Sequence, residues 1–419
     1  MNYYDPMFYL CSEKMPFGIR IEVELKYETD GSMLESAVNT AIKRYPYFAV
    51  KILKSGGELI TVNNDLPIKV FKGNLPYPLG SADVNYHILA LSYFKNKINF
   101  YITHVITDGA GFMPFMKSVL YYYLCKYLKT ELPQGDIRLS DDALLEGEVE
   151  NPYPEKEMAD AFPFYTVPEK EFLRLADCGY VTNGTPTSYN FRVKESDIMK
   201  FSHENDASPC TLFSAVMAKA IWNVHPNETK DIVSAISFNM RPALKSVNNY
   251  RMLCKAIMVR YPKRLDDMAV RNICTCTRGA VMVQSQPENV LFYAEQQKKK
   301  LQKLLKLPDV KSKSDILSRI GLEDSVNNTF SVSYVGRVDY GSLKEHIEGV
   351  RFFTDGSTYK TVFIEISSFN GWFYITMQQG FSGDVYYKAL LKQFEQNGIE
   401  YFEDGPVSID TPNILLPSC

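Results

Sequence analysis

The stretch 97–115, KINFYITHVITDGAGFMPF, places the tightest constraint on how this chain can fold. Lys97–His104 alternates in hydrophobicity and is rich in β-branched and aromatic residues, which predicts a strand. Further on, apolar residues recur at helical spacing, at Phe112, Phe115, Met116, Val119 and Leu120. The intervening TDGAG favours a turn, because glycine permits backbone angles that other residues resist. His104 is therefore expected where a strand ends, and Asp108 in the turn into a helix, a rigid support for a reacting side chain.

The length of the chain, 419 residues, predicts two domains, which we place at 1–180 and 181–419. The crossover between them, at about 130–180, is expected to be mostly irregular. Within it, 141–160 holds eight acidic residues, one basic residue and two prolines. We interpret this segment as a solvated linker, with an acidic binding surface as the alternative.

Composition excludes several classes of protein. The net charge of −3 argues against a nucleic-acid binder, which usually presents a basic face. The start of the chain has no leader peptide, and no apolar run approaches the ~20 residues that span a bilayer. The eight cysteines show no disulfide framework, so we expect a cytoplasmic protein with reduced thiols. Five histidines without a cluster predict no metal site and no tightly bound cofactor.

Periodicity and turn signals predict an alternation of strands and helices. Strands are expected at 18–27, 47–53, 58–62, 87–94, 97–104, 187–193, 231–239, 254–261, 328–334, 361–368 and 372–378. Helices are expected at 32–45, with Ser32 as the N-cap and Glu35 completing a capping box, and at 111–129, 195–204, 208–224, 268–283, 294–307 and 382–397.

Two predicted hairpins share the letters FYIT, at Phe100–Thr103 and Phe373–Thr376. Each copy lies on the second strand of its hairpin and precedes a glycine-containing turn and a helix. We interpret this as a duplicated unit, in which His104 corresponds to Met377. Two similar halves with one proton-handling group imply a site in the cleft between them.

The letters HVITDG match the motif HxxxDG, and in this setting the chain resembles the superfamily of chloramphenicol acetyltransferase and the condensation domains, nearest to its alcohol acetyltransferase-like branch. Thr103 stands where the longer motif HHxxxDG has its first His. Arg44-Tyr45-Pro46, at the end of a helix and before a strand, also resembles this superfamily. The resemblance implies an α/β (α+β) fold of two similar lobes, each a mixed sheet with flanking helices, and an active site between them.

The resemblance also implies an acyltransferase that moves an acyl group, expected to be acetyl, from a coenzyme A thioester to a hydroxyl acceptor. His104 is then the general base, since a neutral imidazole can take the proton of the attacking group. Asp108 is either its catalytic partner or, as in the family, a structural residue paired with an arginine. Arg241, in SFNMRP, is the candidate for that arginine, with a surface salt bridge as the alternative. Gly109 is expected to supply a backbone angle or a close approach.

Other features leave alternatives open. Asn239, Ser331, Ser333 and Tyr334 are candidate oxyanion donors, and the sequence does not choose among them. The lysines of 298–303, with Lys306, Lys311 and Lys313, form either a phosphate-binding face for coenzyme A or a carrier protein, or a solvated helix face. No GxSxG elbow suggests a covalent intermediate. The alternative functions are an amide-forming condensation domain that uses carrier-protein thioesters and an amine acceptor, and a non-catalytic binding descendant of the fold.

Overall fold

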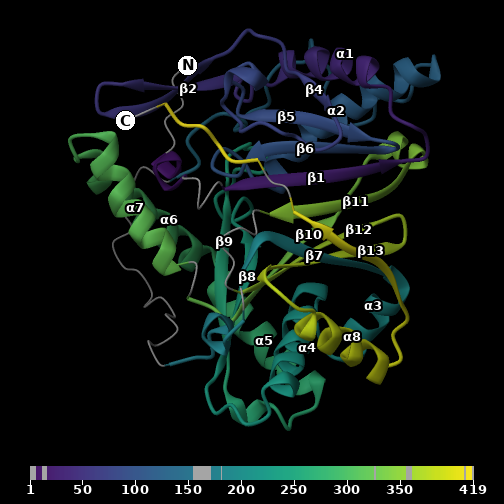
Figure 1. The fold of residues 1–419 in the computed structure, drawn as a ribbon, viewed down its shortest axis with the longest axis vertical. Helices are drawn as coiled ribbons and strands as arrows, with labels where there is room; N and C mark the ends of the chain where they lie inside the picture. The colour runs from purple at the N-terminus through teal and green to yellow at the C-terminus, as the bar shows by residue number, and fades with distance from the viewer. Residues whose placement is uncertain are drawn as a thin grey trace.

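The structure, a computed structural model, describes residues 6–11, 17–153, 171–180, 182–324, 327–354, 361–409 and 412–417. Its two larger sheets are both mixed, and one lies above the other in Figure 1. The upper sheet has the strand order β11-β1-β6-β5-β4. Its strands are β1 (Gly18–Leu25), β4 (Val70–Lys72), β5 (Leu89–Phe94), β6 (Lys97–Thr103) and β11 (Ile347–Thr354). Two helices, α1 (Gly31–Ala41) and α2 (Gly109–Leu128), pack against each other beside it.

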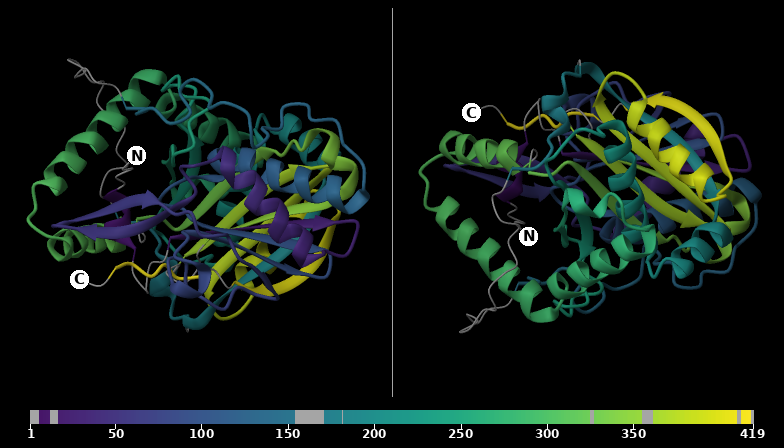
Figure 2. Two further views of the ribbon diagram at one scale, coloured as in Figure 1. Left: turned by 90° about the horizontal axis from the view of Figure 1, so that it is seen from above. Right: turned by 90° about the horizontal axis from the view of Figure 1, so that it is seen from below.

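The lower sheet has the strand order β14-β7-β13-β12-β10-β8-β9. Its strands are β7 (Thr182–Lys194), β8 (Ile232–Asn239), β9 (Cys254–Tyr261), β10 (Phe330–Arg337), β12 (Val362–Phe369), β13 (Trp372–Phe381) and β14 (Tyr401–Ser408). The helices that pack with it are α3 (Glu195–Glu204), α4 (Pro209–Val224), α5 (Val270–Gln284) and α8 (Val385–Gln396). A separate hairpin, β2 (Val50–Ser55) with β3 (Glu58–Asn63), and the helices α6 (Pro287–Leu305) and α7 (Val310–Asp324) lie to one side (Figure 2).

The same four-stranded unit occurs in both sheets, as β1-β6-β5-β4 and as β7-β13-β12-β10. In each, the inner pair is an antiparallel hairpin that carries FYIT on its second strand. In each, the fourth strand runs parallel to its neighbour, β4 to β5 and β10 to β12. A helix follows the second hairpin strand in both copies, α2 and α8. The prediction of two similar lobes is confirmed, although β6 ends before His104 whereas β13 continues past Met377 to Phe381.

Strand β11 joins the lobes, because it comes from the second half of the chain but pairs with β1 in the first sheet. Its other edge is covered by side chains of the lower sheet. Ser367 donates to the Val350 carbonyl at 2.7 Å, and Thr376 donates to the Phe352 carbonyl at 2.7 Å. An edge strand leaves a row of backbone groups unpaired, and these hydroxyl groups satisfy them. The division of the chain at 180 remains a prediction, and β11 crosses it.

Other expectations fail in local detail. The N-cap of α1 is Asp30 rather than Ser32, and its side chain accepts the Met33 N–H at 2.9 Å. Ser32 instead donates its hydroxyl to that same carboxylate at 2.7 Å. Four elements were not expected from the sequence: β4, β11, β14 and α7. Among the residues that the structure describes, no helix is both long and apolar enough to cross a membrane.

Candidate functional site

His104 follows the last residue of β6, and its half-buried ring is held by its own turn. The backbone N–H of His104 donates to the Phe17 carbonyl at 2.6 Å. The ring atom Nδ1 lies 2.8 Å from the Thr107 carbonyl oxygen. A carbonyl oxygen can only accept, so this hydrogen bond assigns the ring proton to Nδ1. In the neutral ring Nε2 therefore carries the lone pair, which is the tautomer that a general base at Nε2 requires.

Asp108 is the N-cap of α2, and its carboxylate is fully engaged away from His104. Oδ1 accepts the Gly111 N–H at 2.9 Å and Arg241 Nη2 at 2.8 Å. Oδ2 accepts Arg241 Nη1 at 2.9 Å and the Leu253 N–H at 2.8 Å. Four contacts fill the usual acceptor capacity of a carboxylate. The structure thus brings Asp108 and Arg241 together in a buried bidentate pair, and turns the His104 ring to Thr107 instead.

The segment 249–253 holds both partners of this pair and the turn beside them. Arg241 donates Nε to the Asn249 carbonyl at 2.9 Å and Nη2 to the Arg251 carbonyl at 2.6 Å. The Thr107 hydroxyl donates to the Tyr250 carbonyl at 2.6 Å. The turn that orients His104 is therefore fixed by side chains and backbone from the other half of the chain.

The close approach expected at Gly109 occurs at Gly111. A Cβ at Gly109 would meet Phe352 and Val335 side chains at 3.4 Å, which is ordinary contact. A Cβ at Gly111 would lie 2.1 Å from the Tyr250 carbonyl oxygen, which no side chain tolerates. Gly111 is thus the glycine that the packing of α2 on this segment requires.

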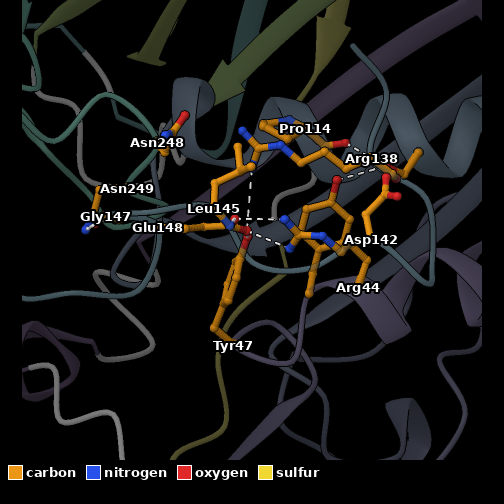
Figure 3. A network of polar contacts seen from close by, with 12 residues as sticks. Arg44, Tyr47, Pro114, Arg138, Asp142, Leu145, Gly147, Glu148, Asn248 and Asn249 are labelled. Carbon is orange, nitrogen blue, oxygen red and sulfur yellow. Dashed lines mark hydrogen bonds and ion pairs between the residues drawn. The ribbon is translucent and has the colours of Figure 1, made fainter. Parts of the chain in front are cut away.

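The acidic crossover contributes a buried anchor that the sequence did not single out. Glu148 is 0% exposed, and Arg44 binds both of its oxygens, at 2.8 and 2.9 Å (Figure 3). Tyr47 donates to Oε1 at 2.5 Å, and the Leu145 N–H donates to Oε2 at 2.8 Å. Burial alone would raise the pKa of Glu148, but these hydrogen bonds hold it below its ordinary value.

This anchor extends toward the site through the same segment 249–253. The Asn249 amide donates to the Gly147 and Glu150 carbonyls, both at 2.9 Å. The ring of Tyr250 stacks on Tyr47 with centroids 4.1 Å apart. A solvated linker was expected here. Residues 141–146 and Glu150 are exposed, whereas residues 147–149 are half-buried or buried between Arg44 and the segment that holds Arg241. Residues 154–170 of the crossover lie outside the described residues.

The four candidate oxyanion donors separate by the face of the sheet on which they lie. Tyr334 stacks on Phe373 and packs with the core on the helix-covered side. By strand alternation, Ser331 and Ser333 lie on the opposite face of β10, together with Val335. Asn239 is exposed, and its side-chain oxygen accepts the Arg241 N–H at 3.0 Å. Of these two serines, Ser333 is nearer along β10 to Val335, against which Gly109 packs.

The lysines expected as one face do not share one environment. Lys299, Lys300, Lys303 and Lys306 are exposed on or just after α6, and Lys299 pairs with Glu295 at 2.8 Å. Lys313 is buried, and its ammonium donates to the Gly57 carbonyl at 2.9 Å. In the part of the chain that the structure covers, no group of three or more His, Cys, Asp or Glu could hold a metal ion.

Comparison with known proteins finds similarity at the level of structure. No family model matches the chain, and no curated protein matches it. F. sporotrichioides TRI101, complexed with coenzyme A and T-2, superimposes with a TM-score of 0.62 at 11% identity, covering 97% of this chain and 100% of that one. The trichothecene 15-O-acetyltransferase TRI3 from Fusarium sporotrichioides gives 0.59 at 11% identity, covering 91% and 90%. The condensation domain of the Monacolin K polyketide synthase MokA gives 0.53 at 11% identity, covering 94% and 96%. At these identities the similarity establishes a shared fold.

Proposed function

We propose that this chain, whose fold is that of the chloramphenicol acetyltransferase-like and condensation-domain superfamily, is an acyltransferase that uses His104 as its general base. The observation that carries the proposal is the hydrogen bond between His104 Nδ1 and the Thr107 carbonyl. In the neutral form of this half-buried ring it leaves the lone pair on Nε2, so that Nε2 can accept a proton from a bound alcohol.

The reaction we propose transfers an acyl group from a coenzyme A thioester to a hydroxyl group. The acceptor oxygen attacks the thioester carbonyl carbon while Nε2 takes the hydroxyl proton. The C–S bond of the resulting tetrahedral intermediate then breaks, and the imidazolium returns the proton to the departing thiolate. The products are an ester and free coenzyme A, and no covalent bond to the protein forms. Ser333 is our candidate donor to the oxyanion.

Asp108 and Arg241 have a positioning role in this proposal. Their pair fixes the start of α2 and the segment 249–253, and Thr107 connects that segment to the His104 ring. A dyad of His104 and Asp108 is disfavoured, because all four contacts of the carboxylate are made by Arg241, Leu253 and Gly111.

The experiment compares thiol release from acetyl-coenzyme A, with a panel of alcohols, in the wild type and in His104→Ala. The exposed His203 on α3 supplies a matched control, His203→Ala. We expect His104→Ala to lose about 10²–10⁴-fold in kcat while its melting temperature is retained. We expect His203→Ala to match the wild type. Full turnover in a folded His104→Ala protein would refute the proposal.

A condensation domain is the second candidate, because MokA shares the fold at a comparable TM-score. It predicts an amine or hydroxyl acceptor and an acyl group delivered on a carrier protein. Assaying the same acyl group on coenzyme A and on a purified carrier protein separates the two candidates. Turnover only with the carrier-bound donor would favour condensation.

A further inference from the structure

Beside the candidate oxyanion donor Ser333, one face of the lower sheet carries polar side chains that the proposed reaction leaves without a role. On β12, Ile364 and Ile366 enter the core beneath α4 and α8, whereas Ser367 donates to the Val350 carbonyl of β11. Odd-numbered residues of β12 therefore point toward the upper lobe. We call this the inner face of the sheet. Glu365 lies on it, in register with Ser333 of β10 and Thr376 of β13.

Thr376, Glu365 and Ser333 form a row across the strands of the inner face, and this row continues across β8 and β9. Ser331 pairs with Ala235, so Ser333 stands next to Ser237, two residues further along parallel strands. Ser237 in turn pairs with Ala256 of β9. Ser237 and Ala256 are exposed, Ser333 is half-buried and Glu365 is buried. The row therefore leads from solvent to a carboxyl group inside the molecule.

Glu365 is 6% exposed, and its Oε2 atom has no hydrogen-bond partner among the described residues. One row away on the same face, the buried Gln378 likewise leaves Nε2 unpartnered in the described part of the protein. A buried polar atom without a partner costs about 1–3 kcal/mol. Two such atoms on one face indicate that a polar ligand completes their hydrogen bonding.

The turn that follows the proposed general base lies against the same face of the sheet. Gly109, the first residue of α2, packs against Val335, the next inner-face residue of β10 after Ser333. Cys254 of β9 lies near both regions, since burial first raises the pKa of its thiol to about 12, followed by Asp108 and, more weakly, Glu365, whereas Arg241 lowers it.

The chemistry of the row selects what it can bind. Glu365, Ser333, Ser237 and Ala256 include one carboxyl group and no cation, which disfavours the phosphates of coenzyme A. Burial raises the pKa of Glu365 to about 8, so that the carboxyl group is mostly protonated at pH 7 and can both donate and accept. A hydroxyl or amine group of the acceptor matches this site.

We infer that Glu365 is a specificity-determining residue that binds a second hydroxyl or amine group of the acceptor, an inference that rests on the acyltransferase function proposed above. The acceptor is then bifunctional: one group reacts at His104, and the other hydrogen-bonds to Glu365.

The test uses the full chain as wild type, Glu365→Leu and Glu365→Gln, with Glu204→Gln on the exposed surface of α3 as the control for the same chemical change. Acceptors are a simple alcohol, a diol and an amino alcohol of equal length. We expect Glu365→Leu to raise the acceptor KM about three- to tenfold for the diol or the amino alcohol, and to leave KM for acetyl-coenzyme A and for the simple alcohol unchanged. Glu365→Gln should restore the wild-type KM for the diol, because an amide also donates and accepts hydrogen bonds.

The diol and the amino alcohol show whether the second group that binds Glu365 is a hydroxyl or an amine. An effect of Glu365→Gln on the amino alcohol alone identifies an amine that needs the ionised carboxylate. Equal KM values for all acceptors in wild type and Glu365→Leu, or a change in KM for the thioester alone, would overturn the inference. Calorimetric titration of the diol and the amino alcohol without donor measures the same preference independently of turnover. If thiol release is absent but Glu365-dependent binding is present, the proposed reaction fails and the binding site stands.

Discussion

At the scale of single residues, the hydrogen bonds of the Asp108 carboxylate determine which role this residue can have. Asp108 gives all of its contacts to Arg241 and to two backbone N–H groups, and the ring of His104 is oriented by a carbonyl instead. The roles of these two residues are therefore separable by experiment.

Removing either member of the Asp108–Arg241 pair should be strongly destabilising. Asp108→Ala or Arg241→Ala leaves a buried charge without its partner, which costs about 3–5 kcal/mol. The double variant should cost much less than the sum of the two, and urea unfolding of the four proteins measures that coupling. Additive losses would show that the pair does not act as a unit.

The pH dependence of the free energy of unfolding tests the burial of Glu365. In the folded protein burial raises its pKa to about 8, whereas in the unfolded chain it titrates near 4.5. Its stabilising contribution is therefore complete below about pH 4.5 and is lost as the pH rises through about 8. The nearby thiols of Cys210 and Cys254, with pKa values raised to about 12, stay neutral across this range.

We predict that Glu365→Gln gains stability over the wild type as the pH rises from 5 to 8, by up to ~4 kcal/mol. Denaturant unfolding of both proteins at the two pH values gives the difference. A constant difference between the two proteins across this range would contradict the burial of an ionisable group at this position.

At the scale of elements, helix α2 must begin at one place and in one orientation. Gly111→Ala would put a methyl group against the Tyr250 carbonyl and disturb its hydrogen bond with Thr107. We expect a loss of about 1–3 kcal/mol in stability and reduced kcat. Gly109→Ala, two residues away with ordinary contacts, is the control and should change stability by less than about 1 kcal/mol. Equal effects at the two positions, measured by thermal unfolding, would argue against this packing.

Local signals allowed many elements to be predicted from the sequence. Lys95 and Asn370 adopt positive φ values of 53° and 46° in the turns of their hairpins, as the turn residues indicated. Strand β9 and helix α3 match their predicted limits. Strand β14 was not predicted, because it includes a glycine and a proline. Helix α7 was not predicted, because its composition is mixed and largely polar.

The part of the site that depends on distant partners was not predictable in this way. Glu148 looks like its exposed acidic neighbours in sequence, and its side-chain partners Arg44 and Tyr47 lie 104 and 101 residues earlier in the chain. The Asp108–Arg241 contact, across 133 residues, was suggested only by resemblance to a family. Gly109 belongs to the motif HxxxDG and Gly111 lies two residues after it, and only the position of the Tyr250 carbonyl shows that Gly111 makes the close approach.

At the scale of the whole molecule, the two lobes share a strand. β11 lies in register with β1, whereas its other edge accepts hydrogen bonds from Ser367, Tyr374 and Thr376 of the lower sheet. A sequence-based boundary near 180 cannot show this, because nothing local in 347–354 identifies a partner more than 300 residues away.

We predict that a fragment of residues 1–180 does not fold by itself. Without β11, β1 would present an unpaired edge, and the apolar face shared with Val350 and Phe352 would be open to solvent. Circular dichroism and gel filtration, with the full chain as reference, provide the measurement. A monomeric fragment with a cooperative thermal transition would show that the upper lobe is independent of β11.

The protonation of the His104 ring tests the central claim without knowledge of the acceptor. Nitrogen NMR of protein labelled in its histidines, with the His104→Gln variant to assign the signal, distinguishes the two ring nitrogens. In the neutral ring we expect Nδ1 to carry the proton and Nε2 to carry none. A proton on Nε2 with a bare Nδ1 would contradict the contact with Thr107 and remove the proposed base.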